Sequence, residues 1–347
     1  MKKRFLALVI AIATIFCLAS CKTQQKPQEN GGDTQISYAD FKGKTVMTVG
    51  QGGTPDVIFR HLMAKNGIGI NGDGENSPEK VTIKYATANQ VAYIIQSIKK
   101  GEADYALLGE PAATTVAGKT EKKIVLDLQK EFVKVNKDVN FVQAGLFVSA
   151  RVSAHSAYIN ALVDKLGENK AYVDGNVSGL SDIFKKHEST LGNVAFTKEL
   201  VDNCNVGCKK AGEIKNDVIA FLNAVKEYNP AQIGGALPGD DFYYDFTAAN
   251  NSEYAKTSFT VGVVDGAPTL AVANILDGFN FSDGETTVST GIKLEGAATN
   301  IVADLASGEI DMAIAPLNMA SNLYNKNAAL GIKLASVNIF GCLYLVG

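Results

Sequence analysis

Lys99–Pro111 reads KKGEADYALLGEP and Ala306–Pro316 reads ASGEIDMAIAP, so one pattern occurs in each half of the chain. Each copy is typical of a helix end, a glycine break, an acidic tight turn, a buried apolar strand and a proline that opens the next helix. A second strand–turn–helix pattern precedes each copy, at residues 45–65 and 259–276. The repetition predicts an α/β chain with two lobes that face each other across a cleft, each lobe being a sheet flanked by helices.

The hydrophobic pattern predicts the remaining elements by their period. Strands are expected at 44–49, 81–85, 103–108, 123–127, 143–150, 259–264, 286–293, 311–315 and, as a final pair, within 332–346. Helices are expected at 56–65, 88–100, from about 111, over most of 155–229, and at 270–276, 298–306 and 317–325. Residues 230–258 are rich in proline, glycine and aspartate, which is typical of a connector.

The first residues resemble a bacterial lipoprotein signal. Lys2, Lys3 and Arg4 precede an apolar run, and Leu18–Cys21 (LASC) resembles a lipobox, at which the signal is cut and the cysteine is lipidated. An ordinary secretion signal or a short anchor is the alternative, although the run is shorter than the roughly 20 residues of a membrane span. We expect a signal peptide at 1–20, lipid on Cys21, a flexible linker over 21–37, and a location on the extracytoplasmic face of the cell membrane.

The charge of the chain argues against a nucleic-acid partner. Without residues 1–20, 30 basic residues stand against 36 acidic ones, a formal charge of about −6. No basic stripe is present that could neutralise phosphates. No later segment is long and apolar enough to span a bilayer, so the remainder is expected to be a tethered soluble domain.

Three cysteines remain after residue 21. Cys204 and Cys208 are close enough in sequence for a small disulfide loop outside the cytoplasm, and two free thiols are the main alternative. A metal site is disfavoured because no histidine lies nearby. Cys342 lies in an apolar run and is expected in the core.

Two turns between a strand and a helix are the candidate ligand sites, because ligands of open α/β sheets bind at the carboxyl ends of the strands. Such turns offer backbone N–H groups and a helix N-terminus to a polar or negative group. Each could instead be a structural turn with proline at a helix start. The candidate residues are Gly52, Gly53, Thr54 and Pro55 in one turn, and Gly266, Ala267, Pro268 and Thr269 in the other.

Catalytic constellations are not apparent in the sequence. His61, His155 and His187 are scattered and lack a recognisable nucleophile partner. The acidic pairs at 102/104 and 309/311 precede strands, at the end opposite the expected binding edge, and are interpreted as solvated turn charges. We therefore expect no enzyme activity, no cofactor and no metal.

Several segments together resemble the substrate-binding proteins of ABC importers of the sulfonate, nitrate and taurine type. That family has a two-lobed periplasmic-binding-protein-like fold of type II. The resemblance extends over nearly all of 38–347 and rests on DFKGKTV (40–46), GGTP (52–55), ADYALLGEP (103–111), LDL (126–128), IGGALPGDDFYY (233–244), DGAPT (265–269) and APLNMASNLYNK (315–326). One enzyme of this fold, a pyrimidine synthase, is disfavoured because its cysteine-rich signature is absent.

The order of these segments differs from the order in the family. Joining Gly347 to Ser37 and cutting between Tyr244 and Phe259 would restore it, which suggests a circular permutation with residues 245–258 bridging the family's usual ends. A truncated or misassembled gene is the alternative. The permutation predicts lobe two at 38–146 and lobe one at 151–347, with Phe340–Gly347 packed beside the start of strand 44–49.

The resemblance also implies a function and further site residues. Glu110, Asn318 and Met319 are expected to face the cleft, although Glu110 could simply cap the following helix. The expected function is delivery of a sulfonate, nitrate-like anion, taurine or thiamine-type pyrimidine to an ABC permease by a monomeric binding protein whose lobes close about a hinge. A sensor that presents solute to a membrane receptor and a degenerate surface interaction protein are the alternatives.

Overall fold

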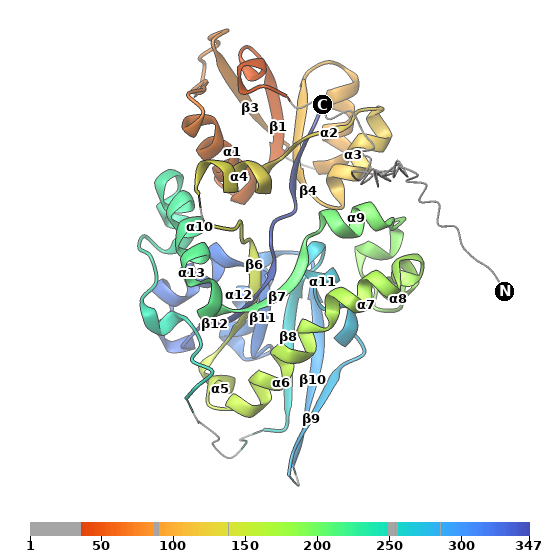
Figure 1. The fold of residues 1–347 in the computed structure, drawn as a ribbon, viewed down its shortest axis with the longest axis vertical. Coiled ribbons are helices and arrows are strands. Elements are labelled where there is room, and N and C mark those ends of the chain that lie inside the picture. The colour runs from red at the N-terminus through yellow and green to blue at the C-terminus, as the bar shows by residue number, and fades with distance from the viewer. Residues whose placement is uncertain (1–35, 87–89, 138, 249–253, 255, 285) are drawn as a thin grey trace, which may run out of the picture. The chain divides into compact units, whose positions relative to one another are not determined.

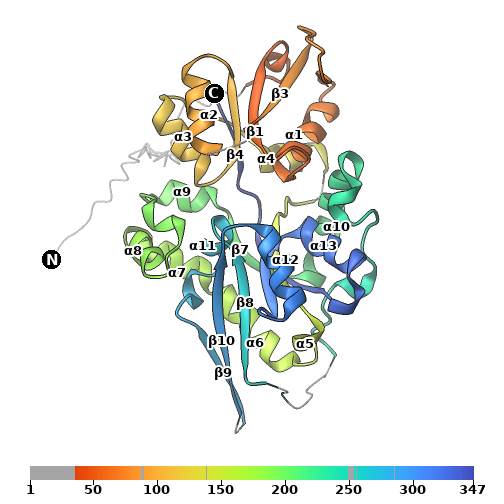
Figure 2. The same cartoon turned by 180° about the vertical axis from the view of Figure 1, so that it is seen from behind.

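The computed structural model describes residues 36–347 except 87–89, 138, 249–253, 255 and 285. Within them the chain forms two sheets with helices packed against them (Figures 1 and 2). The predicted α/β class and the predicted arrangement of two lobes, each a sheet flanked by helices, are confirmed. The predicted signal peptide, Cys21 and nearly all of the predicted 21–37 linker lie outside the described residues. In the part that is described, no helix has the length and apolar character needed to cross a membrane.

The first sheet has six strands in the order β2-β3-β1-β4-β13-β5. Its strands are β1 (Thr45–Val49), β2 (Gly69–Ile70), β3 (Lys80–Ala86), β4 (Tyr105–Gly109), β5 (Ile124–Asp127) and β13 (Leu343–Val346). Its helices are α1 (Thr54–Lys65), α2 (Gln90–Lys99), α3 (Ala112–Thr120) and α4 (Leu128–Val135).

The second sheet has seven strands in the order β7-β12-β6-β11-β8-β10-β9. Its strands are β6 (Ala144–Val148), β7 (Val206–Lys210), β8 (Ser258–Val264), β9 (Phe279–Asp283), β10 (Thr286–Glu295), β11 (Met312–Pro316) and β12 (Lys333–Ile339). The helices that accompany it are α5 (Ala150–Ser153), α6 (Ser156–Gly167), α7 (Asn169–Gly175), α8 (Leu180–Lys186), α9 (Lys198–Asn203), α10 (Lys215–Tyr228), α11 (Ala267–Leu270), α12 (Ala298–Ser307) and α13 (Leu317–Lys326).

The repeated acidic turn makes the same contacts in both sheets. The N–H of Asp104 donates to the carbonyl of Thr45 at 2.9 Å, and its carboxylate accepts from the N–H of Thr45 at 2.8 Å. Asp311 makes the same pair of bonds with Thr260, at 2.9 and 3.0 Å. Each aspartate thus ties its own strand to a parallel neighbour, β4 to β1 and β11 to β8. The repeated sequence encodes this register.

The interpretation of these carboxylates as solvated is wrong for Asp311. Its side chain is fully buried and pairs with Arg151 at 3.3 Å and with Lys256 at 2.7 Å. Asp104 fits the prediction better, because its side chain is 39% exposed and, among the described residues, forms an ion pair only with Lys44. The difference arises because Arg151 and Lys256 lie over the second copy of the turn.

The chain crosses between the sheets twice. The first crossing joins α4 to β6, and the predicted strand 143–150 belongs wholly to the second sheet, between β11 and β12. The second crossing joins β12 to β13, which returns to the first sheet and lies antiparallel between β4 and β5. The sheets therefore divide the chain differently from the predicted lobes, because β13 leaves the second lobe. β4 separates β13 from β1, so the expected direct packing of the last strand against strand 44–49 is wrong.

Several elements differ from the predicted pattern. β7 and β9 are strands within segments that were expected to be helical or irregular, and both lie at edges of the second sheet. The helix expected at 270–276 is replaced by α11 and the short 3-10 helix Ala273–Ile275. The final strands, β12 and β13, belong to different sheets rather than to one pair.

One hydrophobic cluster draws on both sheets. It contains Leu345 from the first sheet and Ala313 from the second, both fully buried. Phe141, in the first crossing, packs against Phe132 of α4 and Phe221 of α10, with ring centroids 5.1 and 5.7 Å apart. This shared core joins the two lobes.

Candidate functional site

A pocket of about 580 Å³ lies between the two lobes. Thr54 and Pro55 contribute the N-terminus of α1, and Asn318 and Met319 contribute that of α13, so four of the predicted ligand residues come together here. The walls are completed by the start of α12, the end of α10 and the crossing to β6. The other lining residues are Gln143, Asn229, Ala231, Gln232, Ala298, Thr299, Val302, Pro316 and Asn322.

Asn318 connects the two sides of this pocket. The hydroxyl of Thr54 donates to its Oδ1 at 3.4 Å, and its Nδ2 donates to Oε1 of Gln232 at 2.9 Å. Asn318 is 7% exposed. Its position follows from the Pro316 turn, which ends β11 and starts α13. Movement of one lobe relative to the other would break the contact with Thr54.

A side chain of the other lobe forms a hydrogen bond with the glycine turn before α1. Gly52 has φ +73°, and Nδ2 of Asn229 donates to its carbonyl at 3.1 Å. A Cβ at Gly52 would lie 2.4 Å from that nitrogen, so glycine permits the approach. The N–H of Gly52 donates to buried Asp56 at 2.8 Å, and the N–H of Gly53 donates to Gly50 at 2.9 Å. These two backbone donors are therefore engaged inside the turn.

Residues 266–269 are arranged differently from the expected facing turn. Thr269 is fully buried, and its hydroxyl donates to Asp265 at 3.2 Å while accepting from the N–H of Gly266 at 3.3 Å. Burial alone would raise the pKa of Asp265, but the hydroxyls of Ser189 and Thr190 hold it below its usual value. The sequence suggested that residues 266–269 would lie opposite Thr54. Among the described residues, Asn318 lies there instead. The ligand role of residues 266–269 stays a prediction.

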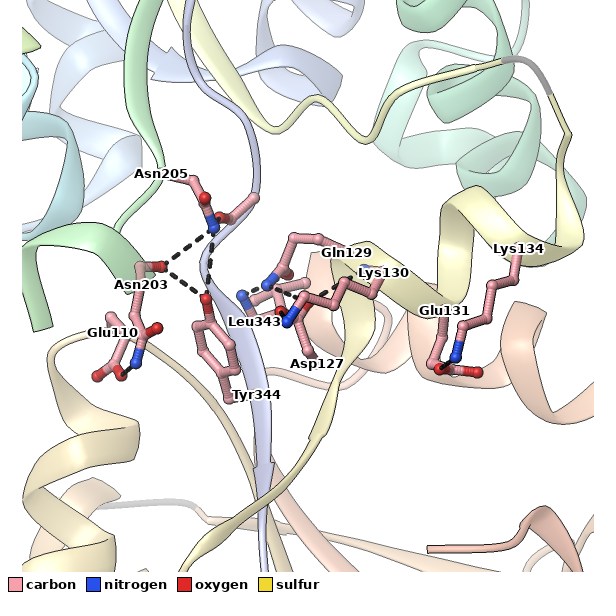
Figure 3. A network of polar contacts seen from close by, with 11 residues as sticks. Glu110, Asp127, Gln129, Lys130, Glu131, Lys134, Asn203, Asn205, Leu343 and Tyr344 are labelled. Atoms are coloured by element: carbon pink, nitrogen blue, oxygen red, sulfur yellow. Dashed lines mark hydrogen bonds and ion pairs between the residues drawn. The ribbon is translucent and has the colours of Figure 1, made fainter. Parts of the chain in front are cut away.

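Glu110 lies at a second contact between the lobes (Figure 3). Its carboxylate accepts from the N–H and hydroxyl of Thr114 in α3, at 3.0 and 2.7 Å, and from Nδ2 of Asn203 in α9 at 3.3 Å. It is 4% exposed. These contacts match the helix-capping alternative, and they add a link to the other lobe that the sequence did not suggest.

A polar network holds the second crossing in the same region (Figure 3). The hydroxyl of Tyr344 donates to the carbonyl of Asn203 at 2.9 Å, and Nδ2 of Asn205 donates to the carbonyl of Gly341 at 2.8 Å. On the other side, Leu343 donates its N–H to Gln129 at 2.7 Å. No sequence motif marks these residues, since their partners are main-chain atoms far away in the chain.

Of the two alternatives for Cys204 and Cys208, the structure shows the two free thiols and not the disulfide loop. Cys204 ends α9 and is buried, whereas Cys208 lies inside β7, where its Sγ donates to the carbonyl of Val163 at 3.5 Å. The extended strand between them carries the two side chains apart. Cys342 is buried as expected, and burial raises its pKa to about 12.

The three histidines occupy separate environments. His61 packs against Phe132, His155 stacks on Tyr254 with centroids 4.3 Å apart, and His187 lies 3.1 Å from Asp277. Among the residues described, no group of His, Cys, Asp or Glu side chains is arranged to hold a metal ion.

Glu110→Gln is expected to change how stability depends on pH. Burial raises the pKa of Glu110, against the opposing hydrogen bonds from Thr114 and Asn203. The folded protein then holds this proton more tightly than the unfolded chain, so the contribution to stability is lost as pH rises above about 4.5, the ordinary value. The free energy of unfolding of the variant, relative to wild type, should therefore increase with pH in urea titrations from acid to neutral. Exposed Glu102→Gln is the matched control. If the free energy of unfolding of Glu110→Gln changed with pH as that of wild type does, the prediction would be contradicted.

Comparisons with known proteins give loose structural likeness only. No family model matches the chain, and no curated protein matches it. Among solved structures it is similar to a binding protein component of an ABC phosphonate transporter from Pseudomonas aeruginosa, with 9% identity, a TM-score of 0.30, and coverage of 87% of this chain and 68% of that one.

Two further structures are similar at the same level. An ancestral arginine-binding protein bound to glutamine has 11% identity and a TM-score of 0.28, with 87% of this chain and 82% of that one covered. A periplasmic oligopeptide-binding protein of an ABC transporter from Thermotoga maritima has 11% identity and a TM-score of 0.27, with 71% and 42% covered. At these values the likeness assigns neither a family nor a ligand to the chain.

Proposed function

We propose that this chain is a lipid-anchored, extracytoplasmic solute-binding protein of an ABC importer, and not an enzyme. The single observation that carries the proposal is the pocket walled by both lobes, with Thr54 and Asn318 in contact across it. A pocket of this size suits a small molecule. A ligand that replaces the weak 3.4 Å contact would bridge the lobes and stabilise their closed arrangement.

The lining of the pocket supports a small polar solute with oxygen acceptors. Five carboxamides and two threonine hydroxyls lie among its residues. The helices α12 and α13 both begin there, and the N-terminus of a helix favours negative charge. The glycine turn before α1 contributes less, because Asp56 already accepts from the N–H of Gly52. The solute classes implied by the resemblance, sulfonate, nitrate, taurine and thiamine-type pyrimidine, remain the compounds to test, and a membrane permease is the proposed partner of a monomer tethered through Cys21.

The segment order is compatible with a circular permutation, which stays part of the proposal. Gly347 pairs with Lys123 through hydrogen bonds of 3.0 and 3.3 Å. A Cβ at Gly347 would lie 2.2 Å from the ring of Tyr105, and that ring packs against Phe41. The last strand and the start of the fold therefore meet at the same sheet, where rejoining them would need only a short link.

The first test is native mass spectrometry of the protein from residue 22, which keeps the whole described fold. A co-purifying small molecule released on denaturation would support the proposal and give the mass of the solute. An empty protein that also shows no thermal shift with the four solute classes would overturn it.

Asn318→Ala is expected to weaken binding of that solute about tenfold, because a buried hydrogen-bonding partner is lost on both sides of the pocket. Calorimetric titration measures the change. Exposed Asn300→Ala, on α12 but outside the pocket lining, should keep the affinity of wild type. An unchanged affinity for Asn318→Ala would move the binding site elsewhere.

A further inference from the structure

A second pocket, of about 560 Å³, lies where both crossings meet. α4 forms one wall with Lys130, Val133 and Lys134, and Phe141 and Phe340 contribute from the two crossings. The opposite wall comes from the second lobe, through β7 and the start of α10. The complete lining is Gln129, Lys130, Val133, Lys134, Asn140, Phe141, Lys209, Ile214, Asp217 and Phe340. None of these residues lines the pocket between Thr54 and Asn318.

The interior of this pocket is apolar and open to a partner. Phe141 and Ile214 are core residues, and Phe340 packs against the same cluster while remaining partly exposed. Val133 is 41% exposed, one of three large hydrophobic side chains described as exposed. Val133 is continuous with the apolar lining of the hollow, and a contiguous apolar hollow rimmed by polar residues is typical of a binding surface.

The rim of the pocket is basic. Lys130, Lys134 and Lys209 line it, and all three are exposed. Lys130 and Lys134 form ion pairs with Asp127 and Glu131 on their own side, at 3.3 and 2.6 Å. Within the described part of the chain, Lys209 has no ion-pair partner, and it faces α4 from the opposite lobe. An exposed pair contributes little energy, so these ammonium groups remain available to a bound anion.

The one carboxylate that lines the pocket is already engaged. Asp217 is 7% exposed and accepts from the N–H and Nδ2 of Asn140, at 2.8 and 3.2 Å. It also lies in the first turn of α10, where negative charge is favoured. Its repulsion of a second anion is therefore reduced, and the carboxamide of Gln129 is used by Leu343 and Asp127.

We propose that this second pocket binds a medium-chain carboxylate, with the hydrocarbon chain against Val133, Phe141 and Phe340 and the carboxylate at Lys209. A chain of about eight carbons fits such a volume, and burial of its methylene groups supplies most of the affinity. The occupant would contact both lobes and both crossings. This site does not depend on the proposed solute function.

The test uses the protein from residue 22, without detergent, and two eight-carbon ligands, one ending in a charged carboxylate and the other in a neutral hydroxyl. Octanoate and octan-1-ol are titrated by calorimetry below the concentrations at which they self-associate. Octanoate is expected to bind about tenfold more tightly than the alcohol, because only octanoate gains the attraction of the lysines. Equal affinities, or no binding of octanoate, would overturn the proposal.

Two variants locate the site. Lys209→Glu should weaken octanoate about tenfold and leave octan-1-ol unchanged, whereas Val133→Gln should weaken both ligands. Lys119→Glu, an equal change of charge at an exposed position of α3, is the control and should behave as wild type. Melting curves of each variant confirm that the fold is kept. If Lys209→Glu binds octanoate as wild type does, the carboxylate is not held at this rim and the assignment fails.

Discussion

Replacing Gly145 by alanine is expected to destabilise the protein by at least about 3 kcal/mol. Gly145 lies in β6, an interior strand of the second sheet, and pairs with Ala315 of β11 and Val337 of β12. A Cβ there would lie 2.2 Å from the carbonyl oxygen of Ser336 and 3.1 Å from the Cα of Val337. Both are backbone atoms of a paired strand, so no flexible side chain can move to make room.

The local irregularity of β12 explains this close approach. The register between β6 and β12 shifts on either side of Ser336 and Val337, which brings the β12 backbone against Gly145. Urea unfolding followed by circular dichroism measures the loss. Gly291→Ala is the matched control, because Gly291 also lies in a strand, β10, but has nothing within 4 Å of the added carbon. Equal midpoints for the two variants would contradict the close approach.

Asp311→Ala is expected to cost about 3 kcal/mol, the lower end for removal of one partner from a buried ion pair. The fully buried carboxylate accepts from the N–H of Thr260 and pairs with Arg151 and Lys256. Both cations are partly exposed, which reduces the cost because water can reach them. The N–H of Thr260 is the group left without its partner.

The internal repeat supplies the control for this prediction. Asp104 holds Thr45 as Asp311 holds Thr260, but its side chain is 39% exposed and has one lysine partner. Asp104→Ala should therefore cost only about 1 kcal/mol. Urea unfolding of the two single variants compares the same aspartate–threonine contact in an exposed and in a buried position. Equal losses would show that burial and the second cation contribute nothing.

The strands and helices of the repeat could be predicted because their signals are local. The apolar run before Pro316 and its turn residues are enough to place β11 and α13. β7 was missed because Lys209 and Lys210 make an edge strand look polar. The place of β13 could not be predicted, since its antiparallel pairing with β4 and β5 depends on residues far away in the sequence.

The candidate site also contains residues that the sequence marks and residues that it does not. Thr54 and Asn318 lie at strand–turn–helix junctions, which the sequence marks. Asn229 and Gln232 reach the pocket from the end of α10 and the segment that follows it, and no local signal distinguishes an amide that lines a pocket from one that faces solvent. Asp56 was not singled out, although it occupies the backbone donor that the glycine turn was expected to offer to a ligand.

The position of β13 between β4 and β5 limits when the first sheet can be completed during synthesis of the chain. β4 and β5 are synthesised early, but the strand that lies between them follows roughly 200 residues later. Until β13 is available, both strands keep an unpaired edge, and such edges can pair with other chains. The second sheet needs only residues that precede this strand, so it can form first. The first sheet of this protein, although most of its strands are encoded earlier, cannot be completed until β13 has been made.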